Sequence, residues 1–329
     1  MSDKRTSNNP GAPSTCHDAW HPGERRMQEL VGSAEVLERA ASLILRASLS
    51  DQMRAFFPRL PFLAIGFVDA VGDPWGTLLP GPAGFVWSPD PTLLRVDRAP
   101  PEGDPLAKLL HPGLSVGLLG IELSTRRRNR VNGVVHECDA TGFSLRVEQC
   151  FGNCAQYIQR REATEASSGP ATVEAQPFRG LDPAVRQLLA TSDTLFVTSF
   201  APGSGGIPAV DIWHRGGPAG FVRADGNALT IPDFLGNRYF NTLGNILAAG
   251  RAGIVVPDFD SGDLLLLTGD AGVGFTKADR EEAETVTGAE RLWRLSVRRG
   301  LWLRGALPPV FRFRDWSPQA LATGAWPSP

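Results

Sequence analysis

The sequence predicts a mainly β protein with a few helices, arranged as two tandem copies of one small barrel. The main observation is a repeated segment: PAGFV occurs at 82–86 and again at 218–222, which is 136 positions further on. The same spacing relates other matched positions: Leu93 and Leu229, Asp97 and Asp233, Gly117 and Gly253, and Gly133 and Gly269. Separated matches at one offset indicate an internal duplication.

Short apolar runs bounded by turn residues supply the β part of the prediction. Residues 62–69 (FLAIGFVD) and 195–200 (LFVTSF) are rich in aromatic and β-branched side chains, which favour strands. Gly84–Val86 and Gly220–Arg223 are expected to continue as strands. The Asp-Gly-Asn sequence at 225–227 predicts a hairpin turn. Strands and turns at this spacing are typical of a small barrel.

Composition limits the classes of function. The chain has 329 residues, 42% of them hydrophobic and 21% charged, as in soluble globular proteins of about two domains. A net charge of −2 provides no global basic field for nucleic acid. Apolar runs fall short of the ~18–20 residues of a membrane span. Four cysteines and a polar leading segment predict reduced thiols and a cytoplasmic location.

Helices and boundaries follow in chain order. Residues 1–19 are expected to be disordered, and 20–160 to form the first barrel, with two leading helices within 24–57. Residues 161–179 have few large apolar side chains and are interpreted as a linker. Residues 180–316 form the second barrel and 317–329 a tail. Three more helices are expected: one capped by Asp182, one over Gly236–Ala248 and one capped by Thr276.

Several segments together resemble a known family. The second copy resembles the pyridoxamine 5′-phosphate oxidase-like, FMN-binding split-barrel proteins in VDIWHRGGPAGFV (210–222), LTIPDFLGNRYFNTLGNIL (229–247) and RAGIVVPDFDSGDLLLLTG (251–269). The first copy resembles the degenerate barrel of a tandem bacterial subgroup in WHPGERRMQ (20–28), GIELSTRRRNRVNG (120–133) and FGNCAQYIQ (151–159). The resemblance implies two split barrels packed as a pseudo-dimer, with a flavin site where they meet.

The expected phosphate site lies at Gly236-Asn237-Arg238. If a helix starts here, backbone N–H groups and an arginine would together suit a phosphate. The resemblance places phosphate-binding residues at this position, so Asn237 and Arg238 are the candidate contacts, with Asn241 as a further donor. The alternative is a solvated Arg238 and an Asn237 that only caps the helix.

His214, Arg215 and Gly216 are the candidate residues beside the flavin ring. Glycine lets a backbone approach a ligand closely, Arg215 would meet the phosphate or ribityl oxygens, and His214 would be catalytic. The first copy serves as an internal control because Leu78 and Leu79 occupy the positions of His214 and Arg215. The barrel therefore does not need the polar pair in order to fold.

An arginine-rich segment in the first copy offers further candidates. In a strand, Arg126, Arg128 and Arg130 would share one face and Arg127 the other. Arg127, Arg128 and Arg130 are therefore candidate contacts to an anionic cofactor or substrate across the interface. The alternative is a solvated basic hairpin. Asp233 has a counterpart in Asp97, which favours a structural turn role for both.

No metal site is expected. His136, Cys138, Cys150 and Cys154 could be drawn as a ligand set, but the Cys-x3-Cys spacing departs from the usual zinc knuckle. Cys154 is interpreted as a structural or redox-active thiol.

The leading hypothesis is an FMN-dependent oxidoreductase that passes hydride through flavin N5 to or from a small molecule. NAD(P)H or a separate reductase would supply electrons, and two chains could pair as a homodimer. Two alternatives are a non-catalytic flavin carrier and a haem protein with His214 as axial ligand. FAD and F420 are alternatives to FMN.

Overall fold

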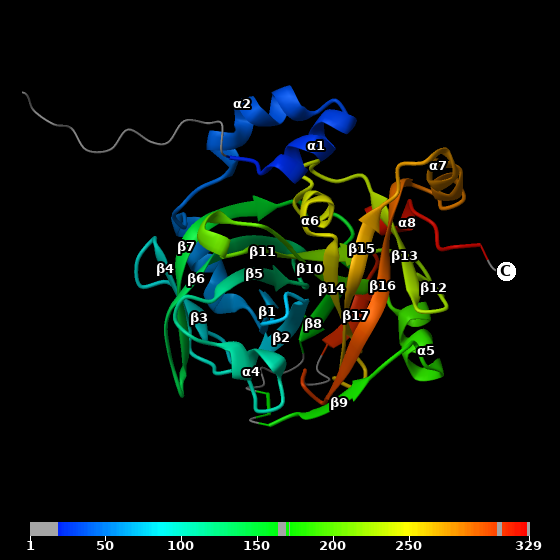
Figure 1. Ribbon diagram of the computed structural model, residues 1–329. Helices are drawn as coiled ribbons and strands as arrows, with labels where there is room; N and C mark the ends of the chain where they lie inside the picture. The colour runs from blue at the N-terminus through cyan, green and yellow to red at the C-terminus, as the bar shows by residue number, and fades with distance from the viewer. Residues whose placement is uncertain (1–18, 164–168, 171, 308–310, 328–329) are drawn as a thin grey trace, which may run out of the picture.

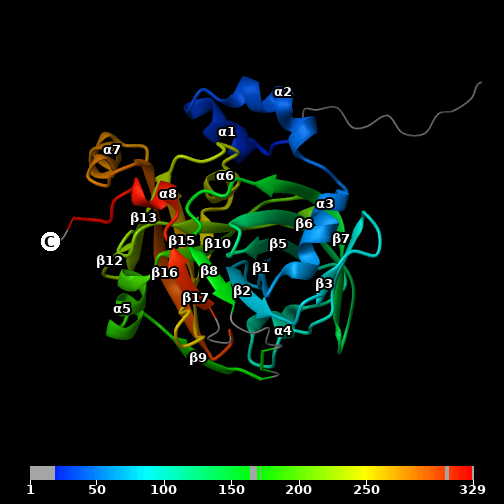
Figure 2. The same cartoon turned by 180° about the vertical axis from the view of Figure 1, so that it is seen from behind.

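Two antiparallel sheets with the same strand order make up most of the protein (Figures 1 and 2). The computed structural model describes residues 19–163, 169–170, 172–307 and 311–327. The expected disordered segment 1–19 therefore lies almost wholly outside the described residues. In space, the first sheet runs β2 (Pro74–Pro80), β1 (Phe62–Val68), β5 (Ser115–Glu122), β6 (Arg127–Asp139), β7 (Gly142–Asn153), β4 (Leu93–Val96) and β3 (Val86–Trp87).

The second sheet repeats this order strand for strand. It runs β11 (Ala209–Gly216), β10 (Thr194–Ala201), β14 (Arg251–Pro257), β15 (Leu264–Val273), β16 (Ala289–Arg304), β13 (Ala228–Phe234) and β12 (Arg223–Asp225). Leu79 pairs with Leu63 in the first sheet, and Arg215 pairs with Leu195 at the corresponding place in the second. Leu79 and Arg215 therefore occupy equivalent positions, as the repeated sequence predicts.

The sheets meet through strands β1, β2 and β5 of the first and β10, β11 and β14 of the second. Two equivalent glycines allow the close approach. A Cβ added at Gly117 of β5 would lie 2.8 Å from the carbonyl oxygen of Val210 in β11, and one added at Gly253 of β14 would overlap the carbonyl oxygen of Pro74 in β2. Both glycines and both carbonyls are related by the repeat offset, so each half approaches the other in the same way.

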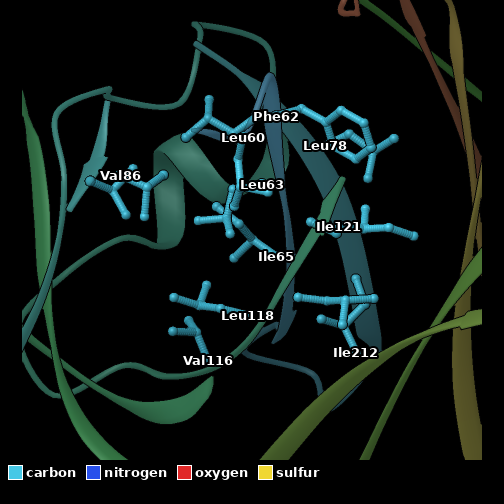
Figure 3. Close-up of a cluster of buried hydrophobic side chains, with 14 of the residues drawn as sticks. Leu60, Phe62, Leu63, Ile65, Leu78, Val86, Val116, Leu118, Ile121 and Ile212 are labelled. Atoms are coloured by element: carbon cyan, nitrogen blue, oxygen red, sulfur yellow. The ribbon is translucent and has the colours of Figure 1, made fainter. Parts of the chain in front are cut away.

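One apolar core runs across this contact. The buried cluster built on the first sheet also takes in Phe196, Ile212 and Leu264 from the second. Figure 3 shows Leu78 of β2 and Ile212 of β11 among its side chains. A second cluster fills the far face of the second sheet around Trp293. Burial of the first cluster, which takes side chains from both sheets, holds the halves together.

The segments expected to lead into and out of the barrels are partly structured. Residues 24–57 contain three helices rather than two: α1 (Pro22–Leu30), α2 (Ala34–Ile44) and α3 (Asp51–Phe56), followed by the 3-10 turn η2 (Phe57–Arg59). The segment expected to be a linker contains β8 (Arg160–Ala163), which pairs with β17 (Phe311–Asp315), and β9 (Glu174–Phe178), which pairs with β16. The expected tail contains α8 (Pro318–Leu321).

The remaining helices are α4 (Pro105–Leu109), α5 (Pro183–Thr191), α6 (Asn241–Ala249) and α7 (Lys277–Glu284), with the 3-10 turn η3 (Ser204–Gly206). Asp182 and Thr276 cap α5 and α7 as predicted. The strands expected at Gly84–Val86 and Gly220–Arg223 are wrong over most of their length. Gly84 and Gly220 have φ of 89° and 81°, so both segments turn before β3 and β12 begin.

Helix α1 packs on α6 at the top of the view in Figure 1. A Cβ added at Gly244 of α6 would lie 2.6 Å from the backbone nitrogen of Glu24 in α1. The two helices therefore contact backbone to backbone, which fixes the position of the first turn of α6.

Candidate functional site

A narrow cleft lies where the end of β11, the end of β13, the first turn of α6 and the loop after β7 converge. Twenty residues line it, most of them from the second half of the chain. Arg128, Cys154, Gln156 and Tyr157 come from the first half, so both halves contribute walls. The sequence-predicted residues His214, Arg215, Gly216, Asn237, Arg238, Asn241 and Arg128 all line this cleft.

His214 is a buried, neutral imidazole. Its side chain contacts the edge of the Phe196 ring, and Nη1 of Arg128 lies 3.4 Å from its Nδ1. Burial lowers the pKa of His214 well below its usual value, and the neighbouring Arg128 and Arg215 lower it further. A guanidinium only donates hydrogen bonds, so Nδ1 must accept and the ring proton sits on Nε2. That Nε2 is buried without a protein partner. His214 therefore offers an unused N–H donor rather than a charge.

Arg215 is held by a carboxylate that also binds a second arginine. Its Nη1 donates to Asp233 at 2.8 Å, and Nη1 of Arg291 donates to the other oxygen of Asp233 at 2.5 Å. Asp233 is a buried residue of β13, so the predicted turn role for it is wrong. The shared carboxylate fixes both guanidinium groups, and Nε of Arg215 remains buried without a partner.

The start of α6 differs from the prediction. The sequence suggests a helix from Gly236, but Arg238 and Phe240 adopt left-handed φ angles of 61° and 60°, and the helix begins at Asn241. Non-glycine residues rarely take this conformation, and such strain concentrates at functional sites. The loop therefore delays the helix and brings Asn241 and Thr242, rather than Gly236, to the helix start.

The first turn of α6 has unused polar groups. No side chain caps it, and the first N–H groups of a helix have no partner within the helix. Oδ1 of Asn241 and Oγ1 of Thr242 are buried without partners, and both residues line the cleft. Nδ2 of Asn241 donates to the Glu24 carboxylate of α1. The helix N–H groups and the Thr242 hydroxyl can donate to an anion at the positive end of the helix dipole, whereas Oδ1 of Asn241 can only accept.

Asn237 and Arg238 lie at the mouth of the cleft. Oδ1 of Asn237 accepts from the backbone nitrogen of Tyr239 at 3.1 Å and so closes a local turn. Arg238 is exposed, and its Nη2 lies 3.5 Å from Glu290. Arg238 can therefore turn toward a ligand, whereas the Asn237 carbonyl already has a structural partner.

Only one of the three candidate arginines on β6 reaches the cleft. Arg128 lines it and donates from Nε to the carbonyl of Cys154 at 2.8 Å. Burial and the nearby Arg215 lower the pKa of Arg128 to about 10. Arg130 instead lies fully buried, paired with Asp211 and packed over Phe151. Arg127 lines a separate cavity between α2, α3 and the start of β6. Arg127 and Arg130 therefore do not line the cleft with the other candidate residues.

Gly216 is a glycine for a reason the sequence does not show. A Cβ at this position would overlap the carbonyl oxygen of Tyr157, from the loop after β7. The close approach therefore joins the two halves of the chain. Tyr157 stacks on Phe234 with ring centroids 5.5 Å apart and donates to the carbonyl of Leu235 at 2.9 Å, forming one wall of the cleft.

The equivalent place in the other half is filled with apolar side chains. The repeat offset relates His214 and Arg215 to Leu78 and Leu79, and it relates Arg128 and Arg130 to Leu264 and Leu266. All four leucines are buried in the shared core (Figure 3 labels Leu78). The fold therefore accommodates leucine at these four positions, and only one half carries polar residues there.

The cleft is positively charged and small. Four arginines and two carboxylates line it, an excess of two positive charges. Its free volume is about 80 Å³, whereas pockets that hold small molecules have roughly 300–1,000 Å³. A flat cofactor would enter only if wall side chains moved outward, and Arg238 is an exposed residue of that wall.

Sequence reasoning did not find Arg291, Thr242 or Tyr157 as lining residues. Arg291 and Thr242 belong to no motif, because their roles depend on pairing between β13 and β16 and on where α6 starts. Tyr157 lies within the segment FGNCAQYIQ, which carries part of the family resemblance but does not indicate that Tyr157 lies at the cleft.

No group of three or more His, Cys, Asp or Glu residues in the described ranges could hold a metal ion. Cys150 is buried, with its Sγ 3.1 Å from the carbonyl of Ser48, and Cys154 is exposed at the cleft. Among the described helices, none is long and apolar enough to cross a membrane.

No protein-family model matches the sequence, and no curated protein matches it. Among solved structures, the chain is similar to HupZ of Group A Streptococcus, at 14% identity over 36% of this chain and 90% of that chain, with a TM-score of 0.27. It is similar to an FAD-binding protein from Mycobacterium smegmatis, at 12% identity over 39% and 99%, with a TM-score of 0.26.

A third similar structure is a pyridoxinephosphate oxidase family protein from Clostridium acetobutylicum, related to general stress protein 26, at 11% identity over 39% and 89%, with a TM-score of 0.20. At these identities and TM-scores the comparisons carry no argument about what this chain binds or does.

Proposed function

We propose that the cleft binds FMN and that the protein is a flavin-dependent oxidoreductase. The observation that carries this proposal is the contrast between two equivalent places: one is closed by leucines, and the other holds His214, Arg215 and Arg128 around unpaired polar atoms. Buried polar atoms without partners are costly, so a ligand that satisfies them is the simplest explanation.

The first turn of α6 would hold the phosphate. Its free N–H groups, the hydroxyl of Thr242 and the exposed side chain of Arg238 form a donor set for an anion. A phosphate monoester carries close to two negative charges, which matches the excess positive charge of the cleft. Entry requires the wall at Arg238 and Glu290 to open, because the free volume is too small for the ring as it stands.

The residues on β11 and β6 would face the ring. When bound, the flavin supplies hydride transfer at its N5 atom. Nε2–H of His214 would donate to a ring heteroatom, and Arg128 and Arg215 would stabilise negative charge on the reduced ring. We therefore propose His214 as a neutral orienting donor rather than an acid. The substrate would be a small molecule, with NAD(P)H or a separate reductase as electron donor.

The two halves are proposed to form a split-barrel pseudo-dimer within one chain. The identical strand orders and the equivalent contacts of Gly117 and Gly253 support this arrangement. A single chain would then complete the site, because the first half supplies Arg128 and Tyr157 and the second half supplies the remaining walls.

The internal repeat supplies the replacement residues for a test of this proposal. Arg128→Leu and the double variant His214→Leu/Arg215→Leu each install the residues that the other half already carries. Both should fold, but their affinity for FMN, measured by quenching of flavin fluorescence, should fall at least about tenfold, since hydrogen bonds to charged groups contribute ~1.5–3 kcal/mol. Arg146→Leu, an exposed arginine on β7, is the control. Unchanged affinity in both folded variants would refute this assignment of the site.

A further inference from the structure

A second cavity lies on the far side of Arg128. It has a free volume of about 480 Å³, within the range of small-molecule pockets. Its walls come from the end of α2, the start of α3, the start of β6, the end of β7 and Tyr239. We call it the basic cavity. It shares Arg128 with the cleft, so one guanidinium belongs to the walls of both.

All the charged side chains that line the basic cavity are positive. Arg46, Arg126, Arg127 and Arg128 line it, and none of its lining residues is acidic. Arg126 is paired with Asp315. Within the described part of the chain, Arg46, Arg127 and Arg128 form no ion pair. Like charges brought together without a counter-charge repel one another, so an anion bound here would relieve that repulsion.

Two of these arginines, Arg127 and Arg128, are restrained by contacts, whereas Arg46 is exposed. The Arg127 guanidinium lies over the Phe56 ring at 5.6 Å from its centroid, and Arg128 is fixed by the carbonyl of Cys154. Restrained side chains lose less conformational entropy when they bind a ligand. Arginine held in this way favours planar, two-pronged recognition of phosphate or carboxylate groups.

An aromatic wall completes the cavity. Phe151 and Tyr239 line it, with ring centroids 5.7 Å apart and ring planes at 74° to each other. Tyr239 lies between Arg238 and Phe240, which both adopt a left-handed conformation and line the cleft. The strained backbone therefore places successive side chains on two different sites, Tyr239 on the basic cavity and its neighbours on the cleft.

We propose that the basic cavity binds an aromatic molecule that carries a phosphate group. The phosphate would be bound by Arg46 and Arg127, and the ring would contact Phe151 and Tyr239. The role of this molecule as substrate or electron donor rests on the proposed flavin function, since Arg128 lines both the cleft and the basic cavity. The binding itself does not depend on flavin, because Arg46 and Arg127 are not part of the cleft.

Isothermal titration calorimetry with phenyl phosphate tests the proposal, with inorganic phosphate and phenol as reference compounds. Phenyl phosphate should bind more tightly than either reference, because only it engages both the arginines and the aromatic wall. Arg127→Gln and Arg46→Gln should each weaken binding about tenfold, a change of ~1.4 kcal/mol. Arg146→Gln, an exposed arginine on β7 outside the cavity, should leave binding unchanged. Raising the salt concentration should weaken binding.

Competition identifies the source of the phosphate. Displacement of phenyl phosphate by NADPH would assign the cavity to a nucleotide donor, and absence of displacement would assign it to a smaller phosphorylated substrate. The proposal would be overturned if phenyl phosphate did not bind. It would also be overturned if the folded Arg127→Gln and Arg46→Gln variants bound phenyl phosphate as tightly as the wild type. The same titrations on flavin-free protein separate this outcome from failure of the flavin proposal, since loss of FMN binding alone would leave the phenyl phosphate result intact.

Discussion

At the scale of single residues, His214 shows how burial determines chemistry. The side chain is enclosed, and two arginines face it, so protonation would place a third positive charge in the same small space. Its pKa therefore falls below the usual value of 6.5. The group remains neutral at physiological pH, which suits a hydrogen-bond donor to a ring and excludes a role as an imidazolium acid.

This burial predicts a pH-dependent stability. The unfolded state protonates His214 near pH 6.5 while the folded state does not, so acidification below 6.5 favours unfolding. The His214→Gln variant has no imidazole at this position, so it lacks this loss of stability on acidification. The difference in unfolding free energy between wild type and variant should therefore shift against the wild type by up to about 1.4 kcal/mol per pH unit below 6.5. Urea unfolding at pH 7.5 and 5.5 measures it. A constant difference would contradict the buried, neutral assignment.

Thr242 predicts a second effect at this scale. Its hydroxyl is buried without a partner at the start of α6. Thr242→Val should therefore preserve stability but weaken FMN binding about tenfold or more, because the proposed bond is to a charged phosphate. Fluorescence titration and thermal unfolding measure the two effects. Thr198→Val is the matched control, since its buried hydroxyl also lacks a partner but lies outside the cleft. Equal losses of affinity in both variants would argue against a phosphate at α6.

At the scale of elements, the strands expected at 62–69 and 195–200 and two helix caps were predictable because local sequence determines them. Asp182 and Thr276 accept hydrogen bonds from backbone nitrogens three residues on, at 2.8 and 3.1 Å, as their residue types predict. The start of α6 was not predictable. Its helical periodicity continues back to Gly236, but contacts with α1 and two left-handed residues set the first turn at Asn241.

Contacts between the sheets make the strongest prediction for elements. A Cβ at Gly253 would overlap a backbone carbonyl of β2, which cannot move without displacing the strand. Gly253→Ala should therefore destabilise the protein by roughly 1–3 kcal/mol, the usual cost of overpacking, as measured by chemical denaturation. Gly272→Ala on β15 is the control, because nothing lies within 4 Å of its added Cβ. If Gly253→Ala is as stable as the control, the close packing of the two sheets is wrong.

At the scale of the whole molecule, the repeated sequence predicted the architecture better than the chemistry. The offset read from PAGFV relates two sheets of equal strand order and two equivalent glycine contacts. It also separated His214 and Arg215 from Leu78 and Leu79. It could not predict which arginines of β6 face the cleft. That depends on Arg130 pairing with Asp211 of the other half, a contact between segments far apart in sequence.

The central claim is that one chain forms one flavin site and that the equivalent place is closed. The most direct measurement is the stoichiometry of FMN bound to the purified, FMN-reconstituted protein, from its absorption spectrum and the mass of the extracted cofactor. We predict one FMN per chain for the wild type, and less than one for the double variant His214→Leu/Arg215→Leu, whose affinity should be at least about tenfold lower. Two FMN per chain, no bound flavin, or the Soret band of haem in the wild type would contradict the account.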